Sequence, residues 1–420
     1  MNIIINDETC KKWMMNKTIN PLSNRKIKEN GPTYKMLEKK CSKSELKSEL
    51  KSYVKKERVS SNIDDRIDYY NIVKDYINRL KLKHTNNCIH TYKINESYEP
   101  TYSVGKNIIL EEKLGQGSYG IVFRSYFRPT NKAKREFGKT FKLVVKICEI
   151  TEKNKLEIDI FNKLTYFTTK KICPHFPISY GYLICNKLNK ISYSSISSAI
   201  SSNNLFYKNS ISDYRINDDS TISSNIMDKE NLYLIVNEYA DTPFSVVLKN
   251  HDINVKINTI IQTLISIMFF QKYMNMSHND THGYNFLCHF IKPGGYYHYR
   301  IYNVDYYLEN LGFLIVINDF GLAKELNYKR FYYDFSKYTQ WFIKYRSYDI
   351  DRNILLFINE LDKVFTKKFE STRSSDIVNA STQFVFYSYL FKYINDNFPK
   401  YLLTIKPDGN IINKTPYIIE

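Results

Sequence analysis

The spacing of hydrophobic and polar positions changes twice along the chain. The first hundred residues are highly charged, with Leu, Ile and Tyr at helix-compatible spacing in Tyr34–Val59 and Ile63–Leu82. From about Tyr102 to Tyr239 the apolar runs become short and are punctuated by glycine, which favours β-strands. Beyond Phe244 a spacing near 3.6 returns, first in Asn254–Tyr273, and predicts helices. We therefore expect three regions, with boundaries 1–100, 101–240 and 241–420.

Three stretches refine this division. Asn186–Asn225 is rich in Ser and Asn and has few core-forming residues, so we expect a flexible insertion there. Leu232–Val236 is uniformly apolar and predicts a buried strand. Ile260–Phe270 is the longest apolar run, and its interruption by Gln262 favours a buried helix over a membrane span.

Composition points to a soluble intracellular protein. The N-terminus lacks the features of a signal peptide. The seven cysteines are dispersed without a C-x-x-C pair, which predicts reduced thiols rather than a disulfide framework. The net charge of +18 comes with many Lys, Asn, Ile and Tyr residues, as an A/T-rich genome would encode. We therefore do not expect nucleic acid to be the main partner, whereas a basic surface that attracts acidic substrates stays open.

A glycine-rich segment lies between two β-like runs, Asn107–Glu112 and Ile121–Tyr126. Glycine lets backbone amides approach phosphate oxygens where a side chain would clash. A dinucleotide-binding fold would need a helix after this segment, and none is apparent, so a hairpin that covers a nucleotide is favoured. The residues are Leu114, Gly115, Gln116, Gly117, Ser118, Tyr119 and Gly120, followed by Val122.

A lysine lies inside the apolar run Leu143–Ile147. A buried ammonium needs a partner, and phosphate oxygens or a carboxylate would suit Lys146. Asn154–Leu164 predicts a short amphipathic helix that carries the candidate carboxylate Glu157, with Glu152 and Asp159 as rivals.

The segment His278-Asn-Asp-Thr-His-Gly-Tyr-Asn285 follows the apolar helix directly. Phosphoryl transfer needs a carboxylate that orients or deprotonates the attacking hydroxyl, and an oxygen ligand for Mg²⁺. Asp280 and Asn285 offer both. The alternation of His278, Asp280 and His282 also fits the ligands of a metal hydrolase.

An apolar run leads into Asp319-Phe-Gly321. Such a run predicts a strand that delivers the aspartate to a turn. Because hard cations prefer carboxylate and phosphate oxygens, Asp319 is a candidate ligand of Mg²⁺.

In this order, the four motifs resemble the eukaryotic-type protein kinase superfamily over roughly residues 102–361. The resemblance implies an α+β fold with two lobes, a small β-rich N-lobe and a mostly helical C-lobe, here with a helical N-terminal extension. It implies that the glycine loop covers the ATP phosphates and that Lys146 contacts them and pairs with Glu157. Asp280 would be the catalytic base, with Asn285 and Asp319 as ligands of Mg²⁺, or of Mn²⁺ in its place.

The resemblance also implies an adenine site. Val236–Ala240 would form the hinge, where the carbonyl of Glu238 and the amide of Ala240 would bind the adenine edge beside Asn237. Three apolar side chains would enclose the ring: Val122, Val144 and Leu287.

Three features depart from the usual kinase pattern. Asn279 replaces the arginine that pairs with a phosphorylated activation loop, and His282 replaces a lysine, giving the H-x-D-x-H-x-x-N spelling of haspin-type and aminoglycoside- or choline-kinase-like enzymes. No A-P-E motif follows Gly321. Instead, Phe331–Phe335 opens an apolar helix, and Asp334 would be the buried aspartate that braces the catalytic loop. A similar Tyr-Tyr-Asp-Phe occurs in poxvirus virion kinases, so the chain resembles serine/threonine kinases of large cytoplasmic DNA viruses.

The sequence thus predicts an ATP-dependent serine/threonine protein kinase that needs no activation-loop phosphorylation. The alternatives are a small-molecule or lipid kinase on the same scaffold, or a non-catalytic pseudokinase scaffold. We expect ATP and a protein substrate as partners and no membrane span. If the source is viral, the host cytoplasm and the virion are the expected locations.

Overall fold

The structure is a computed structural model of the 420-residue chain. It describes residues 13, 18–23, 25–41, 63–81, 89–92, 101–104, 108–117, 120–127, 141–185, 231–327, 331–344, 352–369 and 380–420. The chain divides into two compact units, Met1–Arg58 and Val59–Glu420. This boundary lies inside the 1–100 extension that the sequence suggested.

The first unit has a small aromatic core. Helix α2 (Pro32–Cys41) contributes Tyr34 and Leu37, which bury Trp13 together with the partly buried Ile27. The rings of Trp13 and Tyr34 meet edge to face with centroids 5.4 Å apart. Such a contact stabilises by about 0.5–1.5 kcal/mol beyond area burial.

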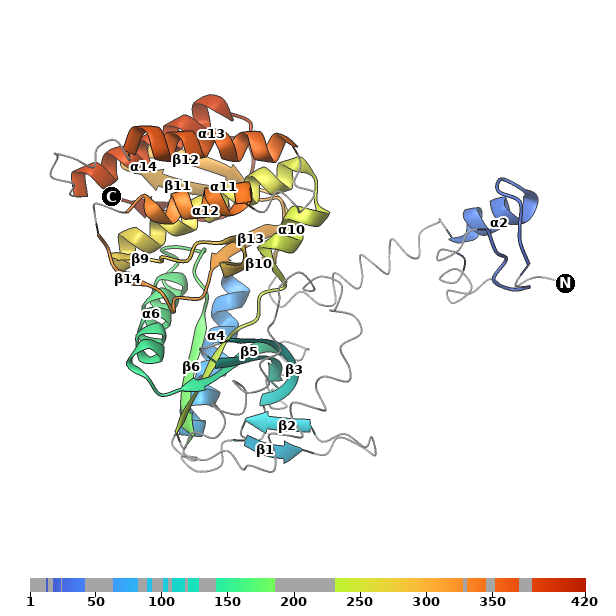
Figure 1. The fold of residues 1–420 in the computed structure, drawn as a ribbon, viewed down its shortest axis with the longest axis horizontal. Helices are drawn as coiled ribbons and strands as arrows, with labels where there is room; N and C mark the ends of the chain where they lie inside the picture. Colours follow the sequence, from blue (N-terminus) through green and yellow to red (C-terminus); the bar gives the residue numbers. More distant parts are fainter. Residues whose placement is uncertain are drawn as a thin grey trace. The chain divides into compact units, whose positions relative to one another are not determined.

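The second unit begins with a seven-stranded sheet in the order β1-β2-β3-β4-β5-β7-β6, and every neighbouring pair is antiparallel. Figure 1 shows these strands at one end of the unit. They are β1 (Ile89–Tyr92), β2 (Thr101–Val104), β3 (Ile108–Gly117), β4 (Gly120–Phe127), β5 (Phe141–Glu149), β6 (Ser179–Cys185) and β7 (Leu232–Glu238).

The two faces of this sheet pack against different helices. Alternation along β5 sends Leu143, Val145 and Ile147 to a core that includes Val73 and Ile77 of helix α4 (Ile63–Lys81). The residues between them, Val144, Lys146 and Cys148, therefore lie on the opposite face. There Cys148 packs with Ile158 of helix α6 (Glu152–Thr169). The sequence pattern thus decides that Lys146 faces α6 rather than α4.

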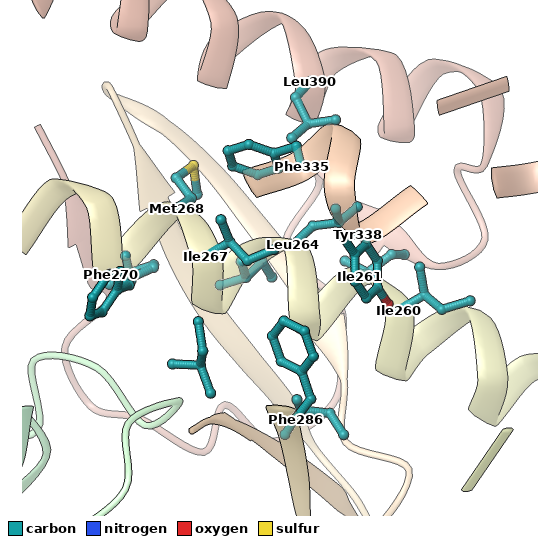
Figure 2. Close-up of a cluster of buried hydrophobic side chains, with 14 of the residues drawn as sticks. Ile260, Ile261, Leu264, Ile267, Met268, Phe270, Phe286, Phe335, Tyr338 and Leu390 are labelled. Atoms are coloured by element: carbon teal, nitrogen blue, oxygen red, sulfur yellow. The ribbon is translucent and has the colours of Figure 1, made fainter. Parts of the chain in front are cut away.

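The rest of the second unit is mostly helical and is built around α11 (Ile253–Met274). This helix is buried nearly all round, and Figure 2 shows its apolar side chains packed between Phe286, Phe335 and Leu390. Asp252 caps its start by accepting the amides of Asn254 and Val255. Around it lie α10 (Phe244–Asn250), α12 (Tyr333–Lys344), α13 (Arg352–Phe369) and α14 (Ala380–Asn397).

Among the described helices, only α11 is long and apolar enough to cross a membrane. However, 83% of its most apolar stretch is buried inside the protein, as expected of a core helix.

Three small sheets complete the unit. β8 (Thr242–Pro243), β10 (Phe286–Phe290) and β13 (Phe313–Ile317) form one, with β10 in the middle. The tyrosine-rich stretch between β10 and β13 forms the hairpin β11 (Tyr296–Ile301) and β12 (Val304–Glu309), which pairs with β15 (Leu402–Leu403) and β16 (Tyr417–Ile419). β9 (Met276–Ser277) pairs with β14 (Lys324–Glu325).

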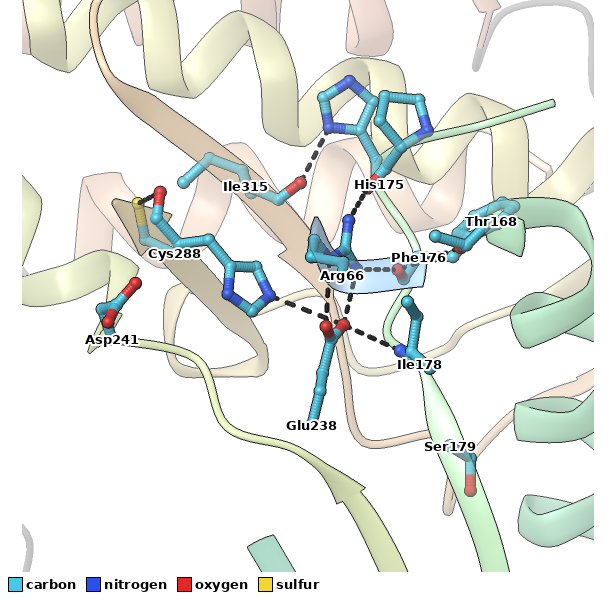
Figure 3. A network of polar contacts seen from close by, with 12 residues as sticks. Arg66, Thr168, His175, Phe176, Ile178, Ser179, Glu238, Asp241, Cys288 and Ile315 are labelled. Carbon is cyan, nitrogen blue, oxygen red and sulfur yellow. Dashed lines mark hydrogen bonds and ion pairs between the residues drawn. The ribbon is translucent and has the colours of Figure 1, made fainter. Parts of the chain in front are cut away.

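A buried ion pair ties α4 to the end of β7. Arg66 donates from Nε and Nη2 to both carboxylate oxygens of Glu238, at 3.0 and 2.5 Å, and also to the carbonyls of Pro174 and Phe176 (Figure 3). The amide of Ile178 donates to the same carboxylate at 2.7 Å. Four of the five guanidinium N–H groups and both carboxylate oxygens thus have hydrogen-bond partners, which makes the buried pair tolerable.

The fold is α+β, as the sequence predicted. The strand at Leu232–Val236 and the helix at Ile260–Phe270 are present within β7 and α11. The expectation of seven reduced cysteines was wrong for Cys185, which is disulfide-bonded, whereas Cys148, Cys173 and Cys288 are free thiols. The expected insertion at 186–225 lies outside the described residues.

Stability should depend on pH through Glu238. Burial by itself would raise the pKa of Glu238, but Arg66 and His289 outweigh it and lower the pKa to about 2. A carboxyl whose pKa is lower in the folded state stabilises above its unfolded pKa of about 4.5, and this contribution is lost as pH falls toward 2. Replacing Arg66 by Met should weaken that dependence and lower the free energy of unfolding at pH 7 by about 3–5 kcal/mol, because Glu238 then stays buried without the arginine that balances its charge.

Urea denaturation at pH 7 and across pH 2–5 measures both effects. The control is Arg300→Met, since Arg300 pairs with Asp305 at the surface and such pairs contribute at most about 1 kcal/mol. Equal losses in the two variants would contradict this account of the Arg66–Glu238 pair.

Candidate functional site

The ammonium of Lys146 lies between both carboxylate oxygens of Glu157, at 2.8 and 2.6 Å. Glu157 is on the buried side of α6, so the pairing expected from the sequence is present, whereas Asp159 faces solvent and pairs with Lys155. Burial disfavours the charge of Lys146, but Glu157 outweighs this and raises the pKa of Lys146, with a smaller contribution from Asp319. The lysine is therefore held charged and in one position.

The glycine-rich segment forms the hairpin between β3 and β4. Gly117 pairs with Gly120 at its end, while Ser118 and Tyr119 lie outside the described residues. Gly120 has φ +143°, and a Cβ there would lie 2.5 Å from the carbonyl oxygen of Ile147, so packing requires glycine. A Cβ at Gly115 would meet no atom within 4 Å. The protein's own packing thus gives no reason for glycine at 115, which leaves room for a ligand.

The residues expected around an adenine are partly exposed beside fully buried neighbours. Val122 pairs directly with Lys146, and Val144 is two residues from it, so all three share one face of the sheet. Leu287 lies in β10, next to Pro243 and Val316 in register. Leu114 is also partly exposed, at the end of β3 that leads to Gly115.

At the end of β7, the sequence suggested a role for the backbone carbonyl of Glu238, and the structure shows a separate role for its side chain. Its side chain points into the protein and binds Arg66, and its amide donates to the carbonyl of Ile178. Ala240 follows the strand and is partly exposed, and Asn237 is buried. The sequence offered no signal for the Arg66 contact, since the partners are 172 residues apart.

Asp280 lies in a loop that we call the Asp280 loop (residues 278–285). The side-chain amide of Asn285 donates to the carboxylate of Asp280 at 3.0 Å and to the backbone carbonyl of Asp280 at 2.8 Å. On the carboxylate, His282 Nε2 lies 3.4 Å from Oδ2 and Lys337 Nζ lies 3.4 Å from Oδ1. Burial would raise the pKa of Asp280, but His282 and Lys337 outweigh it and lower the pKa well below its usual range. The carboxylate therefore stays ionised.

His278 anchors the loop as a neutral imidazole. It is completely buried, and burial lowers its pKa. Its Nδ1 accepts the amide of Asp280 at 3.3 Å, so Nε2 carries the proton that is donated to the carbonyl of Asn318 at 3.0 Å. Both nitrogens are engaged, which argues against the metal-hydrolase alternative. Within the described residues, no three His, Cys, Asp or Glu side chains group as ligands of one metal ion.

Asp334 of α12 is fully buried, and its side chain fixes the backbone of the Asp280 loop. Its carboxylate accepts the amides of His278 and Asn279 at 2.9 and 2.7 Å. Gln271 of α11 donates to it at 2.8 Å and in turn accepts from Tyr387 of α14. Asp334 therefore has the bracing contacts that the sequence suggested for it, and three helices converge on one carboxylate.

Asn318 connects the Asp280 loop to Asp319. Its carbonyl accepts from His278, and its amide donates to the carbonyl of Asn285 at 2.8 Å. Asp319 itself has φ +62°, a left-handed conformation that costs a non-glycine residue about 1–2 kcal/mol. Such local strain is typical of functional residues. Asp319 also acts electrostatically on both Lys146 and Glu157, so it lies near their ion pair.

Phe320 packs the helix of Glu157 against the loop of Asp280. It is buried, with its ring 5.2 Å from Phe161 of α6, 5.2 Å from Phe270 of α11 and 5.4 Å from His278, between centroids. The position of α6, and hence of Glu157, therefore depends on Phe320 and the loop.

Asn279 has a role that the sequence did not reveal. Its φ of +63° suits asparagine better than most residues, and its side-chain amide donates to the carbonyls of Ser277 and Leu322 at 3.3 and 3.2 Å. The segment after Gly321 is further held where β14 pairs with β9. Asn279 thus fixes this segment directly, without a phosphate.

Comparison with known proteins concerns mainly the first unit. Residues 9–43 match the 2-cysteine adaptor domain family, and Cys10 and Cys41 are the two cysteines in that segment. "Uncharacterized protein 378R" of Invertebrate iridescent virus 6 is 66% identical over 32 residues, which are 8% of this chain. The matched region spans 17% of that protein's length. The family match does not reach the Asp280 loop.

The two amides that Asp334 accepts give a testable consequence. Asp334→Asn should lower the free energy of unfolding by about 2–5 kcal/mol, because the single remaining acceptor oxygen cannot serve both buried amides and Gln271. Chemical denaturation measures this. Asp396→Asn is the matched control, since Asp396 forms only an exposed i,i+4 pair with Lys392. A loss at Asp334 no larger than at Asp396 would contradict the bracing role.

Proposed function

We propose that residues 59–420 form an ATP-dependent serine/threonine protein kinase. The observation that carries the proposal is that two pairs of interacting residues both lie next to Asp319. One is the Lys146–Glu157 ion pair, and the other is the Asp280–Asn285 pair, joined to Asp319 through the two backbone hydrogen bonds of Asn318. Phosphoryl transfer needs fixed cations, a metal site and an orienting carboxylate in one place.

The proposal includes the two-lobed arrangement. Strands β2 to β7 of the sheet, with α6, would form the N-lobe (residues 101–240), to which β1 (Ile89–Tyr92) adds an edge strand from the preceding region, and α10 to α14 would belong to the C-lobe (241–420). Helix α4 then braces the N-lobe, and its Arg66 ties α4 to Glu238 at the end of β7, where the chain would pass between the lobes.

ATP would lie on the face of the sheet that carries Lys146. The ammonium, already oriented by Glu157, would contact phosphate oxygens, and the hairpin of Gly115, Gly117 and Gly120 would cover them. Adenine would lie between the partly exposed Val122, Val144 and Leu287, with its edge at the backbone of Glu238 and Ala240.

Asn285 and Asp319 would hold Mg²⁺. The amide nitrogen of Asn285 is occupied by Asp280, so its oxygen is the group available to a metal. A carboxylate and an amide oxygen suit this hard cation, which completes its coordination with phosphate and water oxygens. When bound, Mg²⁺ neutralises charge on the phosphates.

Asp280 would orient the acceptor hydroxyl. Because its pKa is lowered by His282 and Lys337, it is a weak base that remains ionised at neutral pH. It would therefore align the hydroxyl by a hydrogen bond and accept the proton late, as the new bond to phosphorus forms.

No phosphorylated residue is needed in this scheme. Asn279 holds the carbonyl of Leu322 directly, and β14 is already paired with β9. We expect activity in protein from a host without other kinases.

The first unit would act as a separate module. It is compact by itself, and its family is named for an adaptor. We propose that it tethers the kinase to a partner rather than taking part in catalysis, and that the chain is of viral origin, as its iridescent-virus relative suggests.

Incubation of the full chain with radiolabelled ATP, Mg²⁺ and mixed acidic and basic proteins tests the activity. We expect label on serine or threonine, and at least about a 100-fold loss in Asp280→Ala and Asp319→Ala, because each removes a group from the transfer step. Asp305→Ala, which alters an exposed carboxylate on β12, should keep wild-type activity.

Other outcomes separate the alternatives. Label on alcohols or aminoglycosides but on no protein would favour a small-molecule kinase. ATP binding without transfer to any acceptor would favour a scaffold. An Asp280→Ala/Asp319→Ala double variant with full activity would overturn the proposed site.

A further inference from the structure

Lys337 approaches Asp280 from a different element, helix α12. It lies three residues after Asp334, and residues at i and i+3 share a helix face. Asp334 accepts the amides of His278 and Asn279, while Lys337 donates to the carbonyl of Asn279 at 2.6 Å. One helix face therefore binds both the donors and an acceptor of the Asp280 loop.

The ammonium of Lys337 is placed where positive charge is required. It lies 3.4 Å from Asp280 Oδ1, on the other carboxylate oxygen from the one that faces Asn285 and His282. An ammonium has three donors, and the carbonyl of Asn279 and the carboxylate account for two. A third donor would serve a phosphate oxygen brought beside Asp280, and the ring of Tyr333 also lies near this ammonium, with its centroid 5.9 Å away. The side chain is about one-third exposed, so a ligand can reach it.

The other cations near the site are less suited to this task. Lys146 is held by both carboxylate oxygens of Glu157, at 2.8 and 2.6 Å. His282 already directs Nε2 toward Asp280 Oδ2, at 3.4 Å, and its ring has one other nitrogen, whereas the ammonium of Lys337 has three donors.

We propose that Lys337 is a catalytic residue that binds the transferring phosphate and holds Asp280 beside it. The Asp280 loop itself contains no lysine that could bind this phosphate. The inference rests on the proposed kinase activity. In the transfer, the acceptor oxygen bonds to the γ-phosphorus while the bond from that phosphorus to the β,γ-bridging oxygen breaks. ADP leaves with that electron pair, and the hydroxyl proton passes to Asp280. Lys337 neutralises the negative charge on the γ-phosphate oxygens throughout.

The decisive variant is Lys337→Gln, which keeps a hydrogen-bond donor for the carbonyl of Asn279 but removes the charge. We expect kcat to fall about 100-fold, as for loss of one transition-state donor, with KM for ATP changed less than about twofold. Lys337→Arg should retain a larger share of kcat. Lys344→Gln, at the exposed end of the same helix, is the control and should match the wild type.

Two further readouts separate catalysis from loop support. Adding His282→Lys to Lys337→Gln returns an ammonium to the loop and should restore kcat at least about tenfold. Thermal unfolding of each variant, compared with the wild type, checks the fold.

The outcomes are distinct. If the kcat of Lys337→Gln stays within about threefold of the wild type, the inference is overturned and the kinase proposal is left intact. A change of that size is close to the usual error in comparing independent substitutions. The inference is also overturned by a loss of kcat that His282→Lys does not restore and that accompanies a lower unfolding temperature. A wild-type chain without transfer to any acceptor would instead overturn the proposed function, and the role of Lys337 with it.

Discussion

The arrangement of the site depends on the buried carboxylate of Asp334. It fixes the backbone amides at His278 and Asn279, and these place Asp280. His278 then fixes Asn318, whose neighbour Asp319 lies near the Lys146–Glu157 pair. An uncompensated carboxylate in the core would cost several kcal/mol, so the loop amides and Gln271 are as necessary to Asp334 as it is to them.

Burial and charge act together in this chain of contacts. Phe320 fills the space between α6, α11 and the loop, so apolar packing sets how close Glu157 comes to Asp319. At the end of β7, Arg66 of helix α4 neutralises and hydrogen-bonds the buried carboxylate of Glu238. The N-terminal region is thus divided: residues up to Arg58 form their own unit, and α4 is part of the fold that bears the site.

Local patterns predicted the elements and many of the site residues. The alternation in Leu143–Ile147 orients Lys146, whereas the sequence left Glu152 and Asp159 as rivals of Glu157 until the structure showed which carboxylate is buried against the lysine. Contacts across long sequence separations had no such signal. Lys337 lies 57 residues from Asp280 and looks like any helical lysine, and Arg66 lies among the charges of α4. The bond at Cys185 and the hairpin made by the tyrosine-rich stretch likewise depend on tertiary pairing.

The account's central claim is that Lys146, Asp280, Asn285 and Asp319 form one MgATP site. Calorimetric titration of ATP into the full chain, with and without Mg²⁺, tests this claim most directly. The account predicts one ATP per chain, bound more tightly with Mg²⁺, and loss of that Mg²⁺ dependence in Asp319→Ala. Absence of ATP binding to the wild type, or the same Mg²⁺ dependence in Asp319→Ala, would contradict it.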